Sequence, residues 1–132
     1  MSRKVKIIGF VVIAQLLFGV YSCTKTTTVL EDTTPAITTP VSLSKDLQPI
    51  LTKSCAISGC HNGAVAPNLS AATAYSALTT GNLINTTTPA SSEVYLWLTG
   101  KRAVTMPLGS ANNPSNLNAL MLAWIKQGGK NN

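Results

Sequence analysis

The stretch KSCAISGCHN, residues 53–62, contains two of the three cysteines and the only histidine in a chain of 132 residues. Four residues separate Cys55 from Cys60, and His61 follows directly. On a regular helix five residues turn through about 500°, which would leave the two cysteines about 140° apart. Both cysteines can face one site only if the residues between them bulge outward. The pair Ser58–Gly59 permits such a bulge, because serine favours turns and glycine tolerates unusual φ angles.

Four kinds of site use these residue types. Haem attachment uses two cysteines that form thioether bonds and a following histidine that ligates the iron, usually with the spacing C-x-x-C-H. A disulfide between Cys55 and Cys60 is a strong alternative in an exported protein, although it gives His61 no role. A structural zinc site lacks a fourth ligand, and a cysteine–histidine nucleophile lacks a third group to orient the histidine. The spacing alone favours haem attachment only slightly over the disulfide.

Residues 1–22 have the pattern of a secretory signal peptide. Three basic residues precede the apolar run IIGFVVIAQLLFGV, residues 7–20, which is too short for a good transmembrane helix. The segment ends at Cys23 and resembles a bacterial lipoprotein signal, in which this cysteine becomes the lipidated first residue of the mature chain. The alternative is ordinary signal cleavage, which would leave Cys23 as a free thiol.

Residues 23–41 are expected to form an extended tether that begins with the lipidated cysteine. The segment is rich in threonine, and Pro35 and Pro40 argue against a central β-strand. Without the signal peptide the chain carries seven basic and four acidic side chains, a formal charge of +3, and it has no cluster of lysine and arginine. This charge pattern gives no indication of nucleic-acid binding.

Residues 42–132 are expected to form one all-α domain, because no segment alternates polar and apolar residues with a period of two. A domain this small buries a limited core and often depends on a disulfide, a metal or a cofactor. Pro49 fits the first helix only within its first turn or at a kink. Four helices are predicted, each with a serine N-cap: residues 44–55 with Ser44, 70–81 with Ser70, 91–100 with Ser91, and 114–129 with Ser115.

Five segments, in this order, resemble parts of a small class I monohaem cytochrome c in its bacterial lipoprotein form. VSLSKDLQPILTKSCAISGCHN resembles the opening helix with the haem motif, and NGAVAPNLS resembles the segment after the ligand histidine. SSEVYLWLTG and AVTMPLG resemble the following helix and its Met-Pro loop, and NLNALMLAWIKQGG resembles the closing helix. The resemblance covers roughly residues 42–129. It implies a cytochrome c-like helical domain wrapped around one covalently attached haem.

The resemblance also implies the roles of individual residues. Cys55 and Cys60 would form the thioether bonds to haem c, and His61 and Met106 would be the axial ligands of the iron. The carbonyl of Pro67 would accept the proton of His61 and orient its ring. The spacing of four residues departs from the family's usual motif. It leaves open a second arrangement, in which Cys60 alone is attached and Cys55 is free.

The haem would supply the apolar centre that such a small domain needs. A second methionine of the mature chain, Met121, lies on the apolar face of the last predicted helix, where core packing is its expected role. The residues expected to form the walls of the haem site are Leu51, Leu69, Tyr75, Leu83, Leu98, Leu108 and Trp124.

These observations predict an exported, lipid-anchored electron carrier rather than an enzyme. A His/Met-ligated iron has no open position for a substrate, and the mature chain has few carboxylates for acid–base catalysis. The expected partners are redox proteins and the membrane that holds the lipid on Cys23. The expected location is the cell envelope, on the periplasmic face of the outer or inner membrane. Two alternatives stay open: a haem-free lipoprotein interaction module with a Cys55–Cys60 disulfide, and a haem sensor or peroxidase-like domain with an open sixth position.

Overall fold

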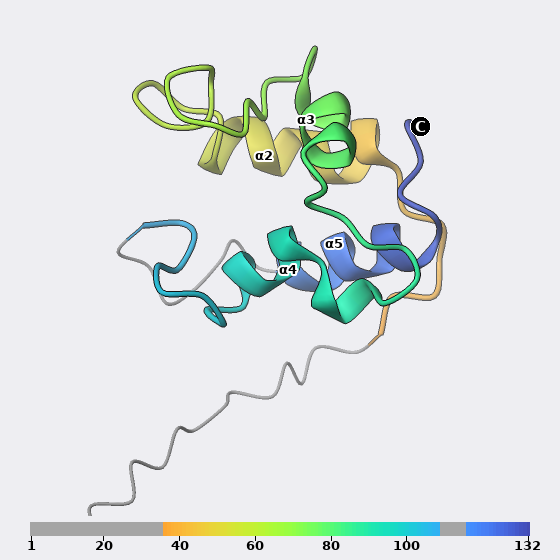
Figure 1. Ribbon diagram of the computed structural model, residues 1–132. Helices are drawn as coiled ribbons and strands as arrows, with labels where there is room; N and C mark the ends of the chain where they lie inside the picture. Colours follow the sequence, from red (N-terminus) through yellow and green to blue (C-terminus); the bar gives the residue numbers. More distant parts are fainter. Residues whose placement is uncertain (1–35, 109–115) are drawn as a thin grey trace, which may run out of the picture. The chain divides into compact units, whose positions relative to one another are not determined.

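This computed structural model describes residues 36–108 and 116–132. These residues form helices joined by turns and loops. The described residues contain no strand, which confirms the all-α class. The elements in chain order are the π-helix η1 (Leu43–Leu47), α2 (Gln48–Ser54), α3 (Ala74–Thr80), the 3-10 helix η2 (Pro89–Ser91), α4 (Glu93–Leu98) and α5 (Leu117–Lys126) (Figure 1). Among these helices, none has both the length and the hydrophobicity that crossing a bilayer requires. The predicted signal peptide, the predicted lipidation site Cys23 and most of the predicted tether lie outside the described residues.

The first predicted helix is two elements, and its cap is Ser42 rather than Ser44. The Ser42 hydroxyl accepts a hydrogen bond from Lys45 N at 3.2 Å, and Asp46 Oδ2 accepts one from Ser42 N at 2.7 Å. This reciprocal pair satisfies two N–H groups at the helix start, as in a capping box. The change from π-helix to α-helix places Pro49 in the first turn of α2, where its missing N–H is tolerated.

The other three helices, in contrast, begin later than predicted. The Ser70 side chain donates to Asn68 Oδ1 at 2.7 Å instead of capping a helix, and a turn precedes α3, which begins at Ala74. A separate 3-10 turn at Pro89–Ser91 moves the cap of α4 to Ser92. Helix α5 begins after Asn116, whose φ is 66°, and the predicted cap Ser115 lies outside the described residues.

The predicted ends of these helices agree better with the structure. Gly81 is the C-cap residue of α3. Gly100 and Gly128 follow the last turns of α4 and α5 with φ angles of 69° and 100°, in the left-handed region that glycine enters without steric cost. Glycine therefore ends each of these helices close to the position that the sequence indicates.

The core is built on α5. The apolar face of this helix buries Leu117, Met121, Trp124 and Ile125, and α5 packs against α4, η1 and η2. The Trp124 indole is 1 % exposed, and its Nε1 donates to the Lys130 carbonyl at 2.8 Å, which satisfies the buried polar atom. The predicted amphipathic face of this helix is confirmed.

The end of the predicted tether packs on the folded part. Val41 is buried, and its N–H donates to Gln127 Oε1 at 2.8 Å. Gln127 Nε2 in turn donates to the Thr39 carbonyl at 2.9 Å, and Leu43 N donates to Asn132 Oδ1 at 2.9 Å. Residues 39–43 are therefore joined to the C-terminal segment, and the folded unit begins before residue 42.

Two long loops bring the site together. One follows α2 and contains residues 55–73, and the other follows α4 and contains residues 99–108. Both loops lie at the same end of the folded unit (Figure 1), and they line the same cavity. The helices behind them provide the apolar floor of that cavity.

Candidate functional site

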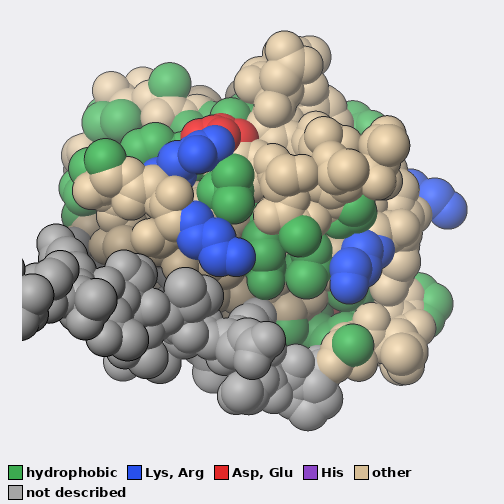
Figure 2. All heavy atoms as spheres, turned by 60° about the horizontal axis from the view of Figure 1, so that its bottom comes forward, with side chains coloured by type: hydrophobic (Ala, Val, Ile, Leu, Met, Phe, Trp, Pro, Cys, Tyr) green, Lys and Arg blue, Asp and Glu red, His purple; other side chains and the backbone are tan. Residues whose placement is uncertain are grey.

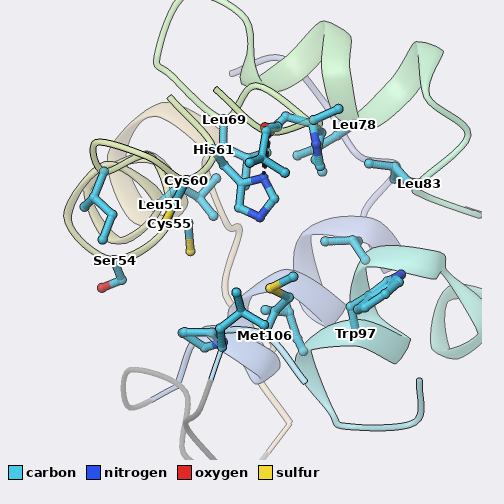
Figure 3. A pocket seen from close by; sticks show the side chains of 18 of the residues that line it. Leu51, Ser54, Cys55, Cys60, His61, Leu69, Leu78, Leu83, Trp97 and Met106 are labelled. Atoms are coloured by element: carbon cyan, nitrogen blue, oxygen red, sulfur yellow. Dashed lines mark hydrogen bonds between the residues drawn. The ribbon is translucent and has the colours of Figure 1, made fainter. Parts of the chain in front are cut away.

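A cavity of about 470 Å³ lies between the two loops and the helices. Its lining is almost entirely apolar and comes from five segments: α2 with the loop after it, α3 with the residues after it, α4, the loop after α4, and α5. A cavity of roughly 300–1,000 Å³ with an apolar lining and a few convergent polar groups is typical of a cofactor or ligand site. Five of the residues expected at the site line it: Cys55, Cys60, His61, Pro67 and Met106 (Figure 3).

The imidazole of His61 is held from one side. Its Nδ1 lies 3.1 Å from the Pro67 carbonyl oxygen and 3.3 Å from the Val65 carbonyl oxygen. Because carbonyl oxygens only accept, Nδ1 carries the proton in both contacts, and Nε2 of the neutral ring keeps its lone pair. The ring extends into the cavity (Figure 3), so the atom that can ligate a metal is free of these two contacts.

The four residues between the cysteines form the predicted outward bulge. Cys60 N donates to the Ile57 carbonyl at 3.0 Å, which closes a turn over Ser58 and Gly59. Gly59 has a φ of 79°, and no atom lies within 4 Å of the position where a Cβ would stand. His61 N donates to the Cys55 carbonyl at 3.1 Å and closes the loop at its base. This bulge lets both cysteines line one cavity despite their long spacing.

Both cysteines are partly buried free thiols in the structure. Burial raises the pKa of the Cys55 thiol above its ordinary value, and the neighbouring Cys60 adds to the increase. A thiol with a raised pKa stays protonated at neutral pH, whereas a nucleophilic cysteine needs a lowered pKa. The chemistry of Cys55 therefore argues against a nucleophilic role.

Met106 lies on the opposite side of the cavity from His61, with Trp97 beside it (Figure 3). Its backbone is fixed, because Met106 N donates to the Trp97 carbonyl at 3.3 Å. Met121 also lines the cavity, but its side chain is fully buried on the core face of α5. The core position expected for Met121 is therefore confirmed, and its contact with the cavity was not anticipated.

The predicted walls agree with the structure in part. Tyr75 and Trp124 do not line the cavity. Trp124 belongs to the core, and Tyr75 packs against the core. The other predicted wall residues do line it: Leu51, Leu69, Leu83, Leu98 and Leu108. Sequence reasoning missed Leu78, Val94 and Trp97, which also contribute to the wall. Trp97 follows Glu93 by four residues, and this helical spacing could have shown that its indole has a polar partner.

The donor atoms of the cavity are few: two thiols, one imidazole and the thioethers of Met106 and Met121. In the part of the chain that the structure describes, no three His, Cys, Asp or Glu side chains come close enough to hold a metal. Structural zinc normally requires four protein ligands. A haem iron takes only axial ligands from the protein, and the pair of an imidazole and a thioether is one of the sets it uses.

Exposed apolar side chains lie at the mouth of the cavity. Ile57, Val65 and Leu108 line the cavity and are exposed, Leu108 by 68 %. One face of the molecule shows exposed apolar side chains between lysine and arginine side chains (Figure 2). Exposed apolar patches bordered by polar residues commonly mark contact surfaces.

Comparison of the chain with known protein families, with curated protein sequences and with solved structures gives no match.

Proposed function

We propose that this chain is an exported, membrane-anchored c-type cytochrome that carries single electrons through a haem ligated by His61 and Met106. One observation carries the proposal: an imidazole and a thioether stand on opposite sides of an apolar cavity that two free cysteines also line (Figure 3). The resemblance of the sequence to class I cytochromes c supports the same reading, and the proposed fold is that of a small cytochrome c.

The residues of the cavity suit this cofactor in three ways. Cys55 and Cys60 would hold the haem covalently, His61 would offer Nε2 to the iron, and Met106 would offer its sulfur. The Pro67 carbonyl would keep the His61 ring in one tautomer and one orientation, which also makes the ring a stronger ligand. When bound, the haem supplies an iron that cycles between Fe(II) and Fe(III).

In this proposal the protein contributes to electron transfer in two ways: it would ligate the iron, and it would exclude water from the ligands. A thioether ligand favours Fe(II), so Met106 would raise the reduction potential. The apolar wall, with Leu51, Leu78 and Leu98 all buried, would keep water from the ligands. With both axial positions filled by the protein, the proposed site has no position for a substrate, and the chain is proposed to be a carrier rather than an enzyme.

The surface supports a protein partner with acidic character. The described residues include six lysine and arginine side chains and two carboxylates. Both carboxylates have partners within the chain: Asp46 accepts from Ser42 N, and Glu93 pairs with Arg102. The remaining positive charge would attract an acidic redox protein to the domain. Lipidation at Cys23 is proposed to hold the domain at the membrane, on the periplasmic side of the cell envelope.

Mass spectrometry of the denatured protein tests the proposal. The full chain would be expressed with its own signal sequence in a host that matures c-type haem. We expect a mass increase of one haem that survives acid and organic solvent, together with a low-spin spectrum that contains the methionine–iron charge-transfer band. A mass equal to that of the bare mature chain less two hydrogens would instead indicate the disulfide-linked interaction module. Covalent haem with an open-site spectrum would indicate a sensor or peroxidase-like domain.

A further inference from the structure

Glu93 and Trp97 of α4 and Arg102 of the loop after it form a hydrogen-bonded cluster, which we call the α4 clasp. Glu93 Oε1 accepts hydrogen bonds from Trp97 Nε1 and from Arg102 Nε, both at 2.8 Å. Arg102 Nη2 bonds to Glu93 Oε2, so the arginine and the carboxylate form a bidentate pair. A pair of this kind restricts both side chains to one relative geometry.

The α4 clasp joins the helix to the loop that carries Met106. Glu93 is the first residue of α4, whereas Arg102 lies beyond its last residue, so the pair ties the start of the helix to the loop that leaves it. Between them, the Trp97 carbonyl accepts hydrogen bonds from Gly100 N at 3.2 Å and Met106 N at 3.3 Å. The backbone of Trp97 therefore bonds to the loop, and the Glu93 carboxylate bonds to the Trp97 indole.

The α4 clasp has more hydrogen bonds and a more restricted geometry than an ordinary surface ion pair. Exposed pairs contribute little to stability unless the geometry is bidentate or the charges form a network. Here the pair is bidentate and a third residue shares the carboxylate, and both charged side chains remain in contact with solvent. The third residue, Trp97, also lines the cavity beside Met106 (Figure 3).

We propose that the α4 clasp positions the sixth ligand, because it keeps Met106 on the cavity wall opposite His61 and thereby excludes competing ligands. The inference rests on the proposed haem function and assigns three further residues to it. Glu93 and Arg102 do not line the cavity, so they are positioning residues that act through Trp97 and the Met106 backbone. Loss of the α4 clasp should free the Met106 loop while the haem stays attached.

Imidazole titration of the ferric holoprotein tests this inference. The variants are Glu93→Gln, which removes the charge at constant size, Trp97→Phe, which removes the indole N–H, and Arg102→Gln, which breaks the pair from the other side. Lys101→Gln is the control, because it removes a neighbouring cation of the same loop. We expect each clasp variant to bind imidazole about tenfold more tightly, the effect of losing one charged hydrogen bond. The control should bind imidazole like the wild type.

Amide hydrogen exchange in the reduced holoprotein gives a readout that does not depend on imidazole. The Met106 amide should exchange about tenfold faster in the clasp variants, whereas amides of α5 should keep their protection if the fold is intact. The double variant Glu93→Gln/Arg102→Gln should show no larger effect than Glu93→Gln alone, because Glu93→Gln already removes the charge with which Arg102 pairs.

The outcomes separate the inference from the function on which it rests. Covalent haem with unchanged imidazole affinity and unchanged Met106 exchange in all three variants would contradict the positioning role of the α4 clasp. The proposed function would be unaffected. A wild-type protein without covalent haem would overturn both. Faster Met106 exchange and tighter imidazole binding in the clasp variants, but not in Lys101→Gln, would establish the positioning role.

Discussion

The Nδ1 atom of His61 lies 3.1 Å from the carbonyl oxygen of Pro67, six residues further along the chain. Together with the Val65 carbonyl, this contact fixes the tautomer of the only histidine in the protein, because a carbonyl oxygen can only accept the proton. It also sets the direction of the ring, whose other nitrogen faces the cavity (Figure 3). The loop from residue 61 to residue 67 therefore leaves Nε2 of His61 free of these contacts, as the proposed role of iron ligand requires.

The identity of the sixth ligand is tested by replacing the two methionines in turn. Met106→Ala should keep the covalent haem but lose the methionine–iron charge-transfer band and lower the reduction potential, because the thioether that favours Fe(II) is gone. Met121→Leu should keep the band, because Met121 is fully buried on α5 and leucine has a similar volume. Optical spectra and a redox titration measure both effects. A band that survives in Met106→Ala would show that another group ligates the iron.

The number of thioether bonds is tested by replacing the two cysteines. Both line the cavity, so we expect two bonds in the wild type and one in each of Cys55→Ala and Cys60→Ala. The double variant should contain no haem that survives denaturation. Mass spectrometry with fragmentation distinguishes these states. If Cys55→Ala has the same attachment as the wild type, Cys60 alone carries the haem and the bulge leaves Cys55 unused.

The bulge itself depends on glycine at one position. Gly59→Ala would place a Cβ on a backbone with a φ of 79°, and this costs roughly 1–2 kcal/mol even though the space around it is open. The variant should attach haem in lower yield, because the turn that aligns the two cysteines is strained. Ser58→Ala is the matched control at the neighbouring exposed position. Equal yields from both variants would show that the left-handed turn is not needed for attachment.

Local sequence signals predicted the features that depend on nearby residues. The periodicity of α5 identified its buried face, since helix geometry alone decides which residues share a face. The bulge between Cys55 and Cys60 was also predictable, because it depends only on nearby residues. Its turn is closed by a hydrogen bond within the segment, and Gly59 supplies the positive φ. Glycine also indicated where α3, α4 and α5 end.

Features that depend on distant or competing partners were not predictable in this way. Ser70 looks like a helix cap, but Asn68 engages its side chain, and α3 starts four residues later. Trp124 and Trp97 both belong to apolar helix faces, and only the packing of whole helices decides which of them meets the cavity. The hydrogen bond from Val41 to Gln127 spans 86 positions of the sequence, which no local pattern reveals.

The buried hydroxyl of Ser92 should contribute measurably to stability. Ser92 is 1 % exposed, and its Oγ accepts a hydrogen bond from Asn85 N at 2.9 Å. Ser92→Ala leaves that N–H without this partner, and we expect a loss of about 1–3 kcal/mol in the free energy of unfolding. Chemical denaturation of the holoprotein measures the loss. Ser91→Ala, at the exposed neighbouring position, should change the free energy of unfolding much less.

The α4 clasp should open at acidic pH. The hydrogen bond from Arg102 lowers the pKa of Glu93 below its ordinary value of 4.5, and the hydrogen bond from Trp97 acts in the same direction. A carboxylate whose pKa is lower in the folded state stabilises the fold above its unfolded pKa, and the contribution disappears as the pH falls through the folded pKa. The methionine–iron band should therefore be constant at neutral pH and weaken as the pH falls below about 4.5.

The variant Glu93→Gln separates this effect from general acid unfolding. It has no carboxylate at this position, so its band should already be weaker at neutral pH and should lack the titration assigned to Glu93. Far-UV circular dichroism, recorded at the same pH values, reports whether the helices persist. A wild type and a Glu93→Gln variant that lose the band at the same pH and with the same loss of helix would show that acid acts on the whole fold, and not through the α4 clasp.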